Sequence, residues 1–357
     1  MLRRRAPATL DRRLRSRPGG AFAAADVEFQ APLRCVGDRR ARVRGGGPGR
    51  VRSSAPSGRG DTLSIQTRRT KVGRIPNFLI IGAMKGGTTA LYRYLQPHPE
   101  IFMPAVKAPE FFVAEANWTR GLEWYRRQFA GADEHVVAVG EASNAYTKYP
   151  QFQGVPERIA SHIPDVRMIY LVRDPIDRIR SHYQTRAWQG DERAPIGTAV
   201  FDDPRYLSYS RYWLQLEQYL SWFPPEQILV ITSEGLRNAR KDSLRRVFEF
   251  LGVDAGFVPD NADREIYRSG DHSSSSLVPL KARKALKRHL PAAKRAKELE
   301  NHVFRTLDRL RGRGTAPPRP PVVMPESVRT RLAAMLEGDV RQLRAFLGSD
   351  LDGWGIA

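Results

Sequence analysis

Residues 78–91, FLIIGAMKGGTTAL, constrain the fold more than any other stretch of this chain. The apolar run at 78–81 is typical of a buried strand, and Leu91 and Leu95 are spaced as on one helix face. A glycine-rich loop joins the two. In such a strand–loop–helix unit, backbone N–H groups and the helix dipole favour a bound anion. The segment therefore predicts a phosphate-binding loop at the end of a parallel strand.

The loop differs from the nucleotide triphosphatase pattern, G-x-x-x-x-G-K-[ST], in the position of its lysine. From Gly82 the chain reads G-A-M-K-G-G-T-T, so the lysine stands inside the loop as Lys85. Thr88 occupies the position of the triphosphatase lysine, and Thr89 keeps the hydroxyl position. The loop is thus predicted to bind an anion with its lysine in a different place.

Short apolar segments alternate with amphipathic ones along the rest of the chain. Strands are predicted at residues 78–81, 136–141, 167–172 and 227–232. Helices are predicted at residues 88–96, 121–129, 156–163, 176–184, 206–222, 242–251 and 325–347. A loop with three prolines is predicted at 97–104. The alternation predicts an α/β, P-loop-like three-layer fold with a central parallel sheet flanked by helices.

The formal charge of +21 is distributed unevenly along the chain. The first 70 residues hold 17 arginines, no lysine and five acidic residues, and they are rich in Gly, Ser and Pro. We therefore predict a disordered basic N-terminal extension at residues 1–73. Such an extension either binds nucleic acid or anionic lipid, or has no function. The absence of an aromatic pattern among its arginines favours the second interpretation.

Cysteine content and hydropathy indicate a compartment. Cys35 is the only cysteine, which excludes an intrachain disulfide and fits a reducing environment. No apolar run reaches the ~20 residues of a membrane span. Charges interrupt residues 6–17, so no secretory signal peptide is predicted, whereas a mitochondrial-type presequence in residues 1–25 remains open. We expect a cytoplasmic protein.

One folded domain is predicted for residues 74–357. Within it, residues 280–320 form a basic helical insertion and a linker, and 325–357 carry the C-terminal helix. Glutamates among the lysines and arginines of the insertion favour solvated helix faces over a nucleic-acid patch. Gly348 is expected to end the last helix.

A second informative segment, IYLVRDPIDRIRSHY, covers residues 169–183. Its strand ends at Arg173, Pro175 forces a turn, and the helix that follows carries Ser181. Ligands of parallel sheets bind beyond the carboxyl ends of the strands, where this segment and the glycine loop both lie. An arginine fork and a neutral hydroxyl suit a phosphate. The two segments predict one site for a diphosphate-like group and a second phosphate.

Together, I-I-G-x-x-K-x-G-T-T-x-L and R-D-P-x-x-R-x-x-S-x-Y resemble the sulfotransferases that use 3′-phosphoadenosine 5′-phosphosulfate (PAPS), in particular the heparan-sulfate type and its bacterial relatives. Further stretches that fit are KAPEFF at 107–112, GEASNAY at 140–146 and QILVITSEGL at 227–236. The resemblance covers residues 76–260 and, more loosely, the C-terminal helix. It implies transfer of a sulfuryl group to a hydroxyl or amine of a carbohydrate, glycolipid or small molecule.

The resemblance also implies roles for individual residues. Lys85 would contact the bridging oxygen, where charge develops as the sulfuryl group leaves. Arg173 and Ser181 would bind the 3′-phosphate, and Arg268 would close over it. The residues implied around the 5′-phosphosulfate are Gly86, Gly87, Thr88 and Thr89. A sulfuryl group carries less charge than a phosphoryl group, so no metal is expected, and the histidines show no ligand spacing.

The general base is less clear from the residues. Relatives of the heparan-sulfate type often read K-E-x-[HQ]-F-F, with the glutamate as the supposed base, whereas this chain has Ala108 there. Glu110 lies two residues further on, and residues i and i+2 of an extended segment share a face. Glu141, at a predicted strand end, is the other candidate. Either carboxylate would accept the proton of the acceptor.

Three alternatives remain beside the sulfotransferase hypothesis. A P-loop kinase needs a lysine where this chain has Thr88. A nucleic-acid-binding protein would depend on the basic extension. The absence of the usual acid at Ala108 leaves room for a non-catalytic nucleotide-binding protein. The acceptor, the choice between O- and N-sulfation, and the oligomeric state have no legible pattern in the sequence.

Overall fold

The computed structural model describes residues 73–263 and 321–357, which belong to one compact unit. The predictions for the N-terminal extension before residue 73, for the basic insertion at 280–320 and for Arg268 lie outside the described residues. In the part described, no helix is long and apolar enough to cross a membrane.

A five-stranded parallel sheet forms the centre of the described fold, with the strand order β2-β3-β1-β4-β5. The strands are β1 (Phe78–Gly82), β2 (Ile101–Phe102), β3 (Ala138–Ala142), β4 (Arg167–Val172) and β5 (Ile228–Thr232). In the centre of the sheet, Phe78 of β1 is in register with Gly140 and Arg167 on its two neighbours. The parallel sheet confirms the predicted fold class.

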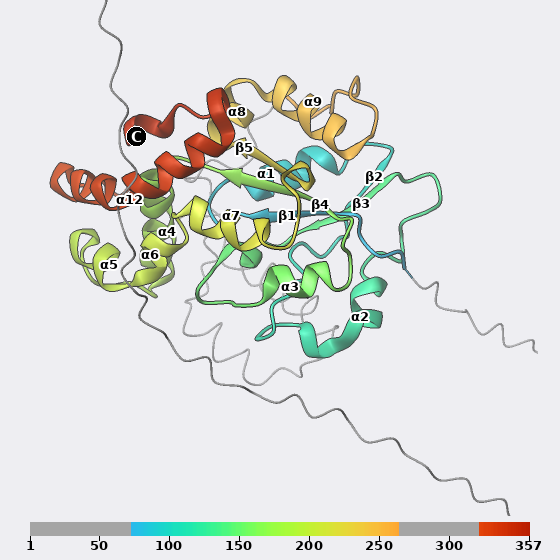
Figure 1. The fold of residues 1–357 in the computed structure, drawn as a ribbon, viewed down its shortest axis with the longest axis horizontal. Coiled ribbons are helices and arrows are strands. Elements are labelled where there is room, and N and C mark those ends of the chain that lie inside the picture. Colours follow the sequence, from blue (N-terminus) through green and yellow to red (C-terminus); the bar gives the residue numbers. More distant parts are fainter. Residues whose placement is uncertain (1–72, 264–320) are drawn as a thin grey trace, which may run out of the picture. The chain divides into compact units, whose positions relative to one another are not determined.

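Helices cover both faces of the sheet, because alternate residues of each strand point to opposite sides (Figure 1). Leu79 and Ile81 pack towards one core, with α2 (Gly121–Arg127), α3 (Val155–Ala160) and α7 (Tyr212–Leu220). Phe78 and Ile80 pack towards the other. That core is closed by α1 (Thr88–Leu95), α8 (Ser233–Asn238) and α9 (Arg240–Leu251). These are the three predicted layers.

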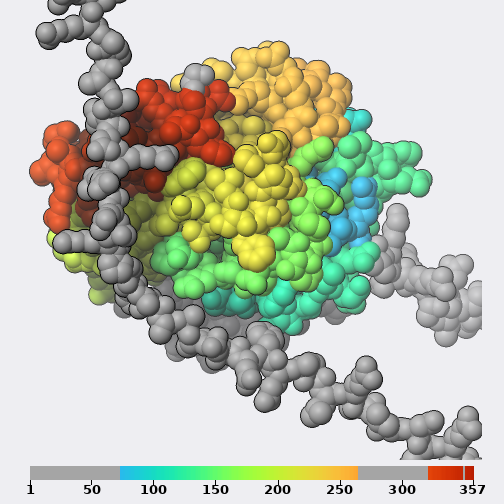
Figure 2. Space-filling model, viewed as in Figure 1, coloured from blue at the N-terminus to red at the C-terminus, as the bar shows by residue number. Residues whose placement is uncertain are grey.

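A third apolar cluster extends the fold beside β4. It joins four helices, α4 (Pro175–Gln189), α5 (Ile196–Asp202), α6 (Pro204–Ser208) and α12 (Glu326–Leu347). The chain's last segment also lies against α7, as Figure 2 shows in red and yellow. There the Asp339 carboxylate accepts hydrogen bonds from the Trp213 and Leu214 N–H groups at 3.0 and 2.9 Å. This carboxylate from α12 caps α7, whose own N-cap residue supplies no side-chain bond.

Short 3₁₀ helices complete the described elements: η1 (Trp118–Arg120), η2 (Asn144–Thr147), η3 (Pro225–Gln227), η4 (Gly348–Asp350) and η5 (Gly353–Gly355). The helix that follows β4 was predicted at 176–184, and α4 starts one residue earlier and ends five residues later. The Asp174 carboxylate accepts hydrogen bonds from the N–H groups of Ile176 and Asp177 at 2.8 and 3.0 Å, with Pro175 in the first turn. Asp174, the residue that caps the start of α4, therefore stands directly after Arg173.

Two predictions about elements are wrong. The single helix expected at 206–222 is divided into α6 and α7, because the buried Ser210 side chain accepts a hydrogen bond from Arg178 and donates one to the Pro175 carbonyl. The loop expected at 97–104 contains the short edge strand β2. The helices α5 and α8 were not predicted at all. The predicted strand at 167–172 agrees with β4 at both ends.

Candidate active site

The carboxyl ends of all five strands meet at one edge of the sheet, and each is followed by polar or charged residues. These residues are Lys107 and Glu110 after β2, Ser143 and Lys148 after β3, Lys85 after β1, Arg173 after β4, and Ser233 after β5. Ligands of parallel α/β sheets bind at this edge. Several loops from distant parts of the chain thus build one candidate site.

The glycine loop is held closely against the neighbouring strands. A Cβ on Gly86 would lie 2.4 Å from the Leu171 carbonyl oxygen, so only glycine fits there. Gly87 has a φ of 97°, a left-handed conformation that side chains disfavour, and α1 starts directly after it. The Ser233 hydroxyl donates to the Gly86 carbonyl, which ties the loop to the end of β5. The loop therefore has the fixed backbone that an anion cradle needs.

Lys85 is partly buried in this loop, with a φ of 71°. Burial lowers the pKa of its ammonium group, and the positive charges of Arg173 and Arg178 lower it further. No carboxylate forms an ion pair with Lys85 among the residues that the structure describes. A cation in this setting favours an anionic ligand, because the ligand would compensate the unfavourable burial.

A second lysine lies at the start of α1. The Lys107 ammonium donates to the Thr89 hydroxyl at 2.5 Å. Burial lowers the pKa of Lys107 to about 8, the nearby Arg93 adds to this, and Glu141 opposes it. Lys107 was not predicted as a site residue, although it begins the KAPEFF stretch. It brings a further positive charge to the helix N-terminus that follows the loop.

Arg173 and Ser181 lie at the end of β4 and on α4, as predicted. The Arg173 guanidinium pairs with Asp177 at 3.2 Å, and its Nε has no hydrogen-bond partner within the described structure. Ser181 is 5% exposed, and its hydroxyl is likewise without a partner there. Buried polar groups are normally paired. The free donors fit a phosphate, which would accept from both.

Arg178 lies fully buried beneath this part of the site. Its Nε donates to the Ser210 hydroxyl at 2.5 Å and its Nη2 to the Tyr206 carbonyl at 2.7 Å. Its Nη1 has no hydrogen-bond partner among the described groups. Burial lowers the pKa of Arg178 to about 10, so it remains a cation at neutral pH. This charge acts on both Lys85 and Lys148. It therefore makes the site more positive without being at the surface.

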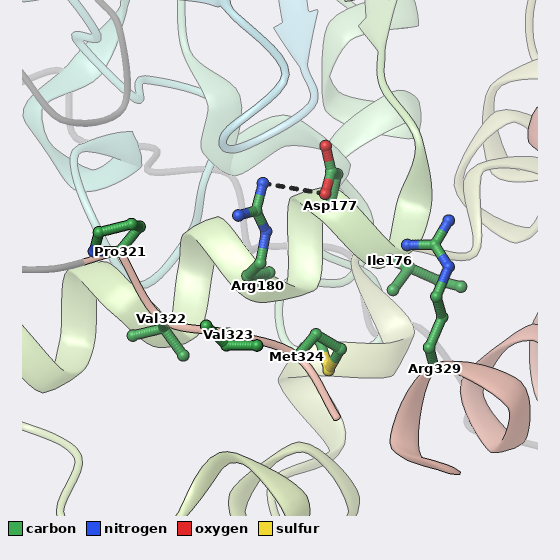
Figure 3. Close-up of a pocket in the computed structure, with 8 residues that line it drawn as sticks. All are labelled: Ile176, Asp177, Arg180, Pro321, Val322, Val323, Met324 and Arg329. Carbon is green, nitrogen blue, oxygen red and sulfur yellow. Dashed lines mark ion pairs between the residues drawn. The ribbon is translucent and has the colours of Figure 1, made fainter. Parts of the chain in front are cut away.

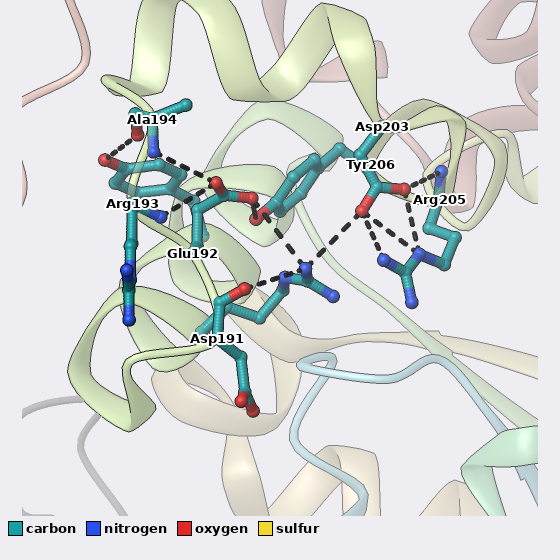
Figure 4. Close-up of polar contacts among 9 residues, drawn as sticks. Asp191, Glu192, Arg193, Ala194, Asp203, Arg205 and Tyr206 are labelled. Carbon is teal, nitrogen blue, oxygen red and sulfur yellow. Dashed lines mark hydrogen bonds and ion pairs between the residues drawn. The ribbon is translucent and has the colours of Figure 1, made fainter.

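A polar network surrounds Tyr206 (Figure 4), whose carbonyl accepts from Arg178. Glu192 accepts hydrogen bonds from the Arg193 and Ala194 N–H groups and from the Tyr206 hydroxyl at 3.2 Å. Arg186 of α4 lies 3.8 Å from the same carboxylate, which joins α4, the loop after it and α6. The network thereby holds Tyr206 and its carbonyl in place for Arg178.

Two acidic residues lie around Ser143: Glu110 in the loop after β2, and Glu141 on β3. The Glu110 N–H donates to the Ser143 hydroxyl at 2.9 Å, and Glu110 itself is half-buried with a φ of 49°. Left-handed backbone is rare for such a residue and is often found at functional sites. Burial raises the pKa of Glu141 to about 7, although Tyr146 donates to its carboxylate at 2.7 Å. Glu141 is fully buried, whereas Glu110 reaches solvent.

A cavity of about 380 Å³ lies beside the first turns of α4 (Figure 3). It is lined by Ile176, Asp177, Arg180, Arg329 and residues 321–324. Asp177 pairs there with Arg180 at 3.0 Å, while its other oxygen pairs with Arg173. The cavity is thus connected to the candidate site through one carboxylate.

Most predicted site residues converge on the sheet edge in the described structure. The glycine loop and Arg173 lie at adjacent strand ends, Ser181 lies on α4, and Glu110 and Glu141 lie around Ser143. Lys107, Lys148, Arg178 and Ser233 were not predicted. Within the described ranges, no group of three or more His, Cys, Asp or Glu residues could hold a metal ion.

Comparison with known proteins agrees with this geometry. The family model of the sulfotransferase domain matches residues 76–302, which is more than half of the chain. The chain belongs to the sulfotransferase domain family. The described sheet and its edge lie within the matched residues up to 263.

Solved and curated relatives support the assignment. The crystal structure of a sulfotransferase from Alicyclobacillus acidocaldarius matches with a TM-score of 0.57 and 26% identity, covering 79% of this chain and 99% of that one. The human bifunctional heparan sulfate N-deacetylase/N-sulfotransferase 3 is 30% identical over 207 residues, 53% of this chain and 24% of the relative. The human heparan sulfate glucosamine 3-O-sulfotransferase 5 is 31% identical over 195 residues, which are 51% of this chain and 55% of the relative. The match thus spans a quarter to about half of these curated relatives.

Proposed function

We propose that this sulfotransferase transfers a sulfuryl group from PAPS to a hydroxyl or amine of a carbohydrate, glycolipid or small-molecule acceptor. In this proposal the protein acts in the cytoplasm and needs no metal ion. The family supports the donor, and the names of the curated relatives favour a carbohydrate among the possible acceptors.

One observation carries the proposal: two sets of positively charged and hydrogen-bond-donor groups follow the adjacent strands β1 and β4. The glycine loop with Lys85 suits the phosphosulfate. Arg173 suits a second phosphate together with the Ser181 hydroxyl, which has no partner among the residues described. PAPS carries a 3′-phosphate in addition to its 5′-phosphosulfate, whereas ATP has only a 5′ chain. The proposal keeps Arg268 as a further ligand of the 3′-phosphate.

Within the donor site, Lys85 neutralises the charge that develops on the bridging oxygen as the S–O bond to the 5′-phosphate breaks. The electron pair of that bond remains on 3′,5′-ADP, and the new bond joins sulfur to the acceptor oxygen or nitrogen. The backbone from Gly86 to Thr89 holds the 5′-phosphosulfate at the start of α1. Lys107, which already contacts Thr89, adds positive charge there. Preorganised charge of this kind lowers a barrier by several kcal/mol, as an order of magnitude.

Glu110 takes the proton of the acceptor in this mechanism. Its carboxylate is half-buried and therefore accessible to an acceptor, whereas Glu141 is fully buried and cannot touch one. Glu141 instead has a supporting role through Ser143. The Ser143 hydroxyl lowers the pKa of Glu141 by hydrogen bonding, and the same hydroxyl accepts from the Glu110 N–H.

Calorimetry with purified full-length protein tests the donor assignment. We expect 3′,5′-ADP to bind more tightly than ATP with magnesium, with the same affinity in EDTA as in magnesium. Tighter binding of ATP with magnesium would contradict the proposal and support a kinase. Binding of both nucleotides without any transfer would support the non-catalytic alternative.

A screen with ³⁵S-labelled PAPS tests the reaction itself. Glycan, glycolipid and phenolic acceptors are incubated with the enzyme in the presence of EDTA, and labelled products are separated from the donor. We expect at least one acceptor class to give a product that disappears when Lys85 is replaced. A screen in which no class gives product removes the proposed activity.

A further inference from the structure

The segment 107–113, which carries Glu110, is held against the donor site at its first residue. The Lys107 ammonium donates to the Thr89 hydroxyl at 2.5 Å, and Thr89 is the second residue of α1, directly after the glycine loop. Glu110 follows Lys107 by three residues, a stretch that spans at most about 11 Å. The acid that the proposed mechanism uses therefore lies close to the start of α1, where the phosphosulfate would bind.

The backbone at Glu110 has a conformation that is unusual for its residue type. Glu110 has a φ of 49°, and Ala108, two residues before it, has a φ of 59°. Both values fall in the left-handed region, which is unfavourable for residues with a Cβ and persists where the surrounding structure imposes it. A segment with two such residues, separated only by Pro109, therefore needs contacts that hold it in place.

Two side chains from other segments hold the peptide group between Pro109 and Glu110. The Ser143 hydroxyl accepts from the Glu110 N–H at 2.9 Å, and the Asn117 side-chain amide donates to the Pro109 carbonyl at 2.8 Å. This N–H and this carbonyl belong to one planar peptide group, so the two bonds fix the orientation of that plane. Because φ of Glu110 is the rotation that directly follows the plane, the two bonds also help to keep Glu110 left-handed.

Ser143 and Asn117 themselves stand on hydrogen-bonded turns. Ser143 is fully buried, and its carbonyl accepts from the Tyr146 N–H at 3.2 Å at the start of η2. Asn117 directly precedes η1, and its carbonyl accepts from the Arg120 N–H at 3.1 Å. The peptide before Glu110 is therefore bound from two sides by side chains whose own backbone is held.

We propose that Ser143 and Asn117 are positioning residues, which clamp the Pro109–Glu110 peptide so that the Glu110 carboxylate is presented to the acceptor. The inference rests on the proposed function, in which Glu110 takes the proton. The directions open to a side chain depend on the backbone φ and ψ, so a change of φ at Glu110 would move its carboxylate. A general base has to lie within hydrogen-bond reach of the proton that it takes. Loss of either bond therefore slows proton transfer and leaves the donor site intact.

Double-mutant cycles test this role with ³⁵S-labelled PAPS and the acceptor found in the screen. The variants are S143A, N117A, E110Q and the double variants S143A/E110Q and N117A/E110Q. We expect S143A and N117A each to lower kcat about tenfold, because a displaced base transfers protons less well. In the E110Q background the same changes should alter kcat less than about twofold, since no base remains to be positioned. The KM for PAPS and the Kd of 3′,5′-ADP should stay within about twofold throughout.

Two controls separate positioning from general damage. S221A removes an exposed serine hydroxyl at the end of α7, which bonds only within its own helix end, and should leave kcat unchanged. Thermal unfolding identifies any variant that is damaged as a whole. S143C, whose thiol is of similar size and a weak acceptor, replaces S143A if the latter does not fold.

Equal losses in the wild-type and E110Q backgrounds would overturn the inference, as would an unchanged kcat in both S143A and N117A. Weaker binding of 3′,5′-ADP by these variants would assign the two residues to the donor site and also refute it. Full activity of E110Q would remove the base and with it the inference, while the donor site and sulfuryl transfer would stand. A wild-type enzyme that transfers no label would refute the proposed function itself, and the inference with it.

Discussion

Replacing Glu141 with glutamine should change the pH dependence of stability in a predictable direction. Glu141 is fully buried, and burial raises its pKa from 4.5 to about 7. Tyr146 and Tyr125 donate to one carboxylate oxygen at 2.7 and 3.4 Å, and the other oxygen has no hydrogen-bond partner in the described structure. A glutamine side chain has nearly the same shape and can accept from both tyrosines, but it never ionises.

The direction of the pH effect on the free energy of unfolding depends on which state, folded or unfolded, holds the Glu141 proton more tightly. Because the pKa is higher in the folded protein than in the unfolded one, the folded state keeps the proton over a wider range. The stability that this proton provides is complete below pH 4.5 and is lost as pH rises through 7. The raised pKa corresponds to about 3 kcal/mol across that window. The free energy of unfolding of E141Q relative to wild type should therefore increase by about this amount from pH 4.5 to pH 7.5.

Urea unfolding at pH 4.5, 5.5, 6.5 and 7.5 measures the effect. In E141Q the side-chain NH₂ group takes the position of the oxygen that has no partner in the described structure. Its unmade hydrogen bonds lower the free energy of unfolding by about 1–3 kcal/mol, and this loss does not vary with pH. E123Q, at an exposed position on α2, is the matched control, and its difference from wild type should stay flat. A flat difference for E141Q would refute the argument that Glu141 is a buried acid. A difference that falls with pH would show that its pKa is lowered instead.

Three further predictions concern the donor site and the C-terminal helix. Lys85→Ala should reduce kcat by about 10²–10³-fold in the ³⁵S assay, because preorganised charge is lost, while 3′,5′-ADP still binds; retained turnover would exclude Lys85 from the mechanism. Ser181→Ala should weaken 3′,5′-ADP about tenfold in calorimetry and leave 5′-AMP unchanged, since only the former has a 3′-phosphate to accept this bond; equal losses for both nucleotides would contradict the assignment. Asp339→Ala should lower the free energy of unfolding by about 1–2 kcal/mol in urea, because it removes the acceptor that caps α7. An unchanged urea midpoint would show that this cap contributes nothing.

The sequence predicted well those elements whose residue pattern lies within one short segment. After the exposed Arg167, the residues of β4 form an unbroken apolar run because both faces of a parallel strand are covered, so its bounds could be read directly. The helix at 206–222 has an apolar periodicity that continues across a break. That break depends on Ser210, whose buried hydroxyl binds Arg178 from another helix. No local pattern contains this contact. The strand β2 has only two residues, which is too few for a periodic signal.

The same distinction holds for the candidate site. The glycine loop lies within residues 78–91, and Arg173 and Ser181 lie within residues 169–183. Each segment is contiguous, so its residue pattern alone predicts an anion site at a strand end. Lys107 could not be assigned in this way, because its contact with Thr89 joins two segments 18 residues apart. Lys148 follows a stretch that resembles the family, but its place in the fold depends on the bonds of its neighbours Thr147 and Tyr149 to residues far away in the sequence.

This difference explains why the donor is easier to infer than the acceptor. The donor side uses backbone N–H groups, a helix N-terminus and adjacent strand ends, all of which follow from the fold class and a short motif. In the proposed function the acceptor faces the loops after β2 and β3, which are held by partly buried hydrogen bonds such as those of Ser143 and Gln215. A change in any of these loops would leave the sheet and the donor site intact while it moved Glu110 or Lys148. Acceptor preference can therefore change with few substitutions in such a protein, and it has to be determined from the loops themselves.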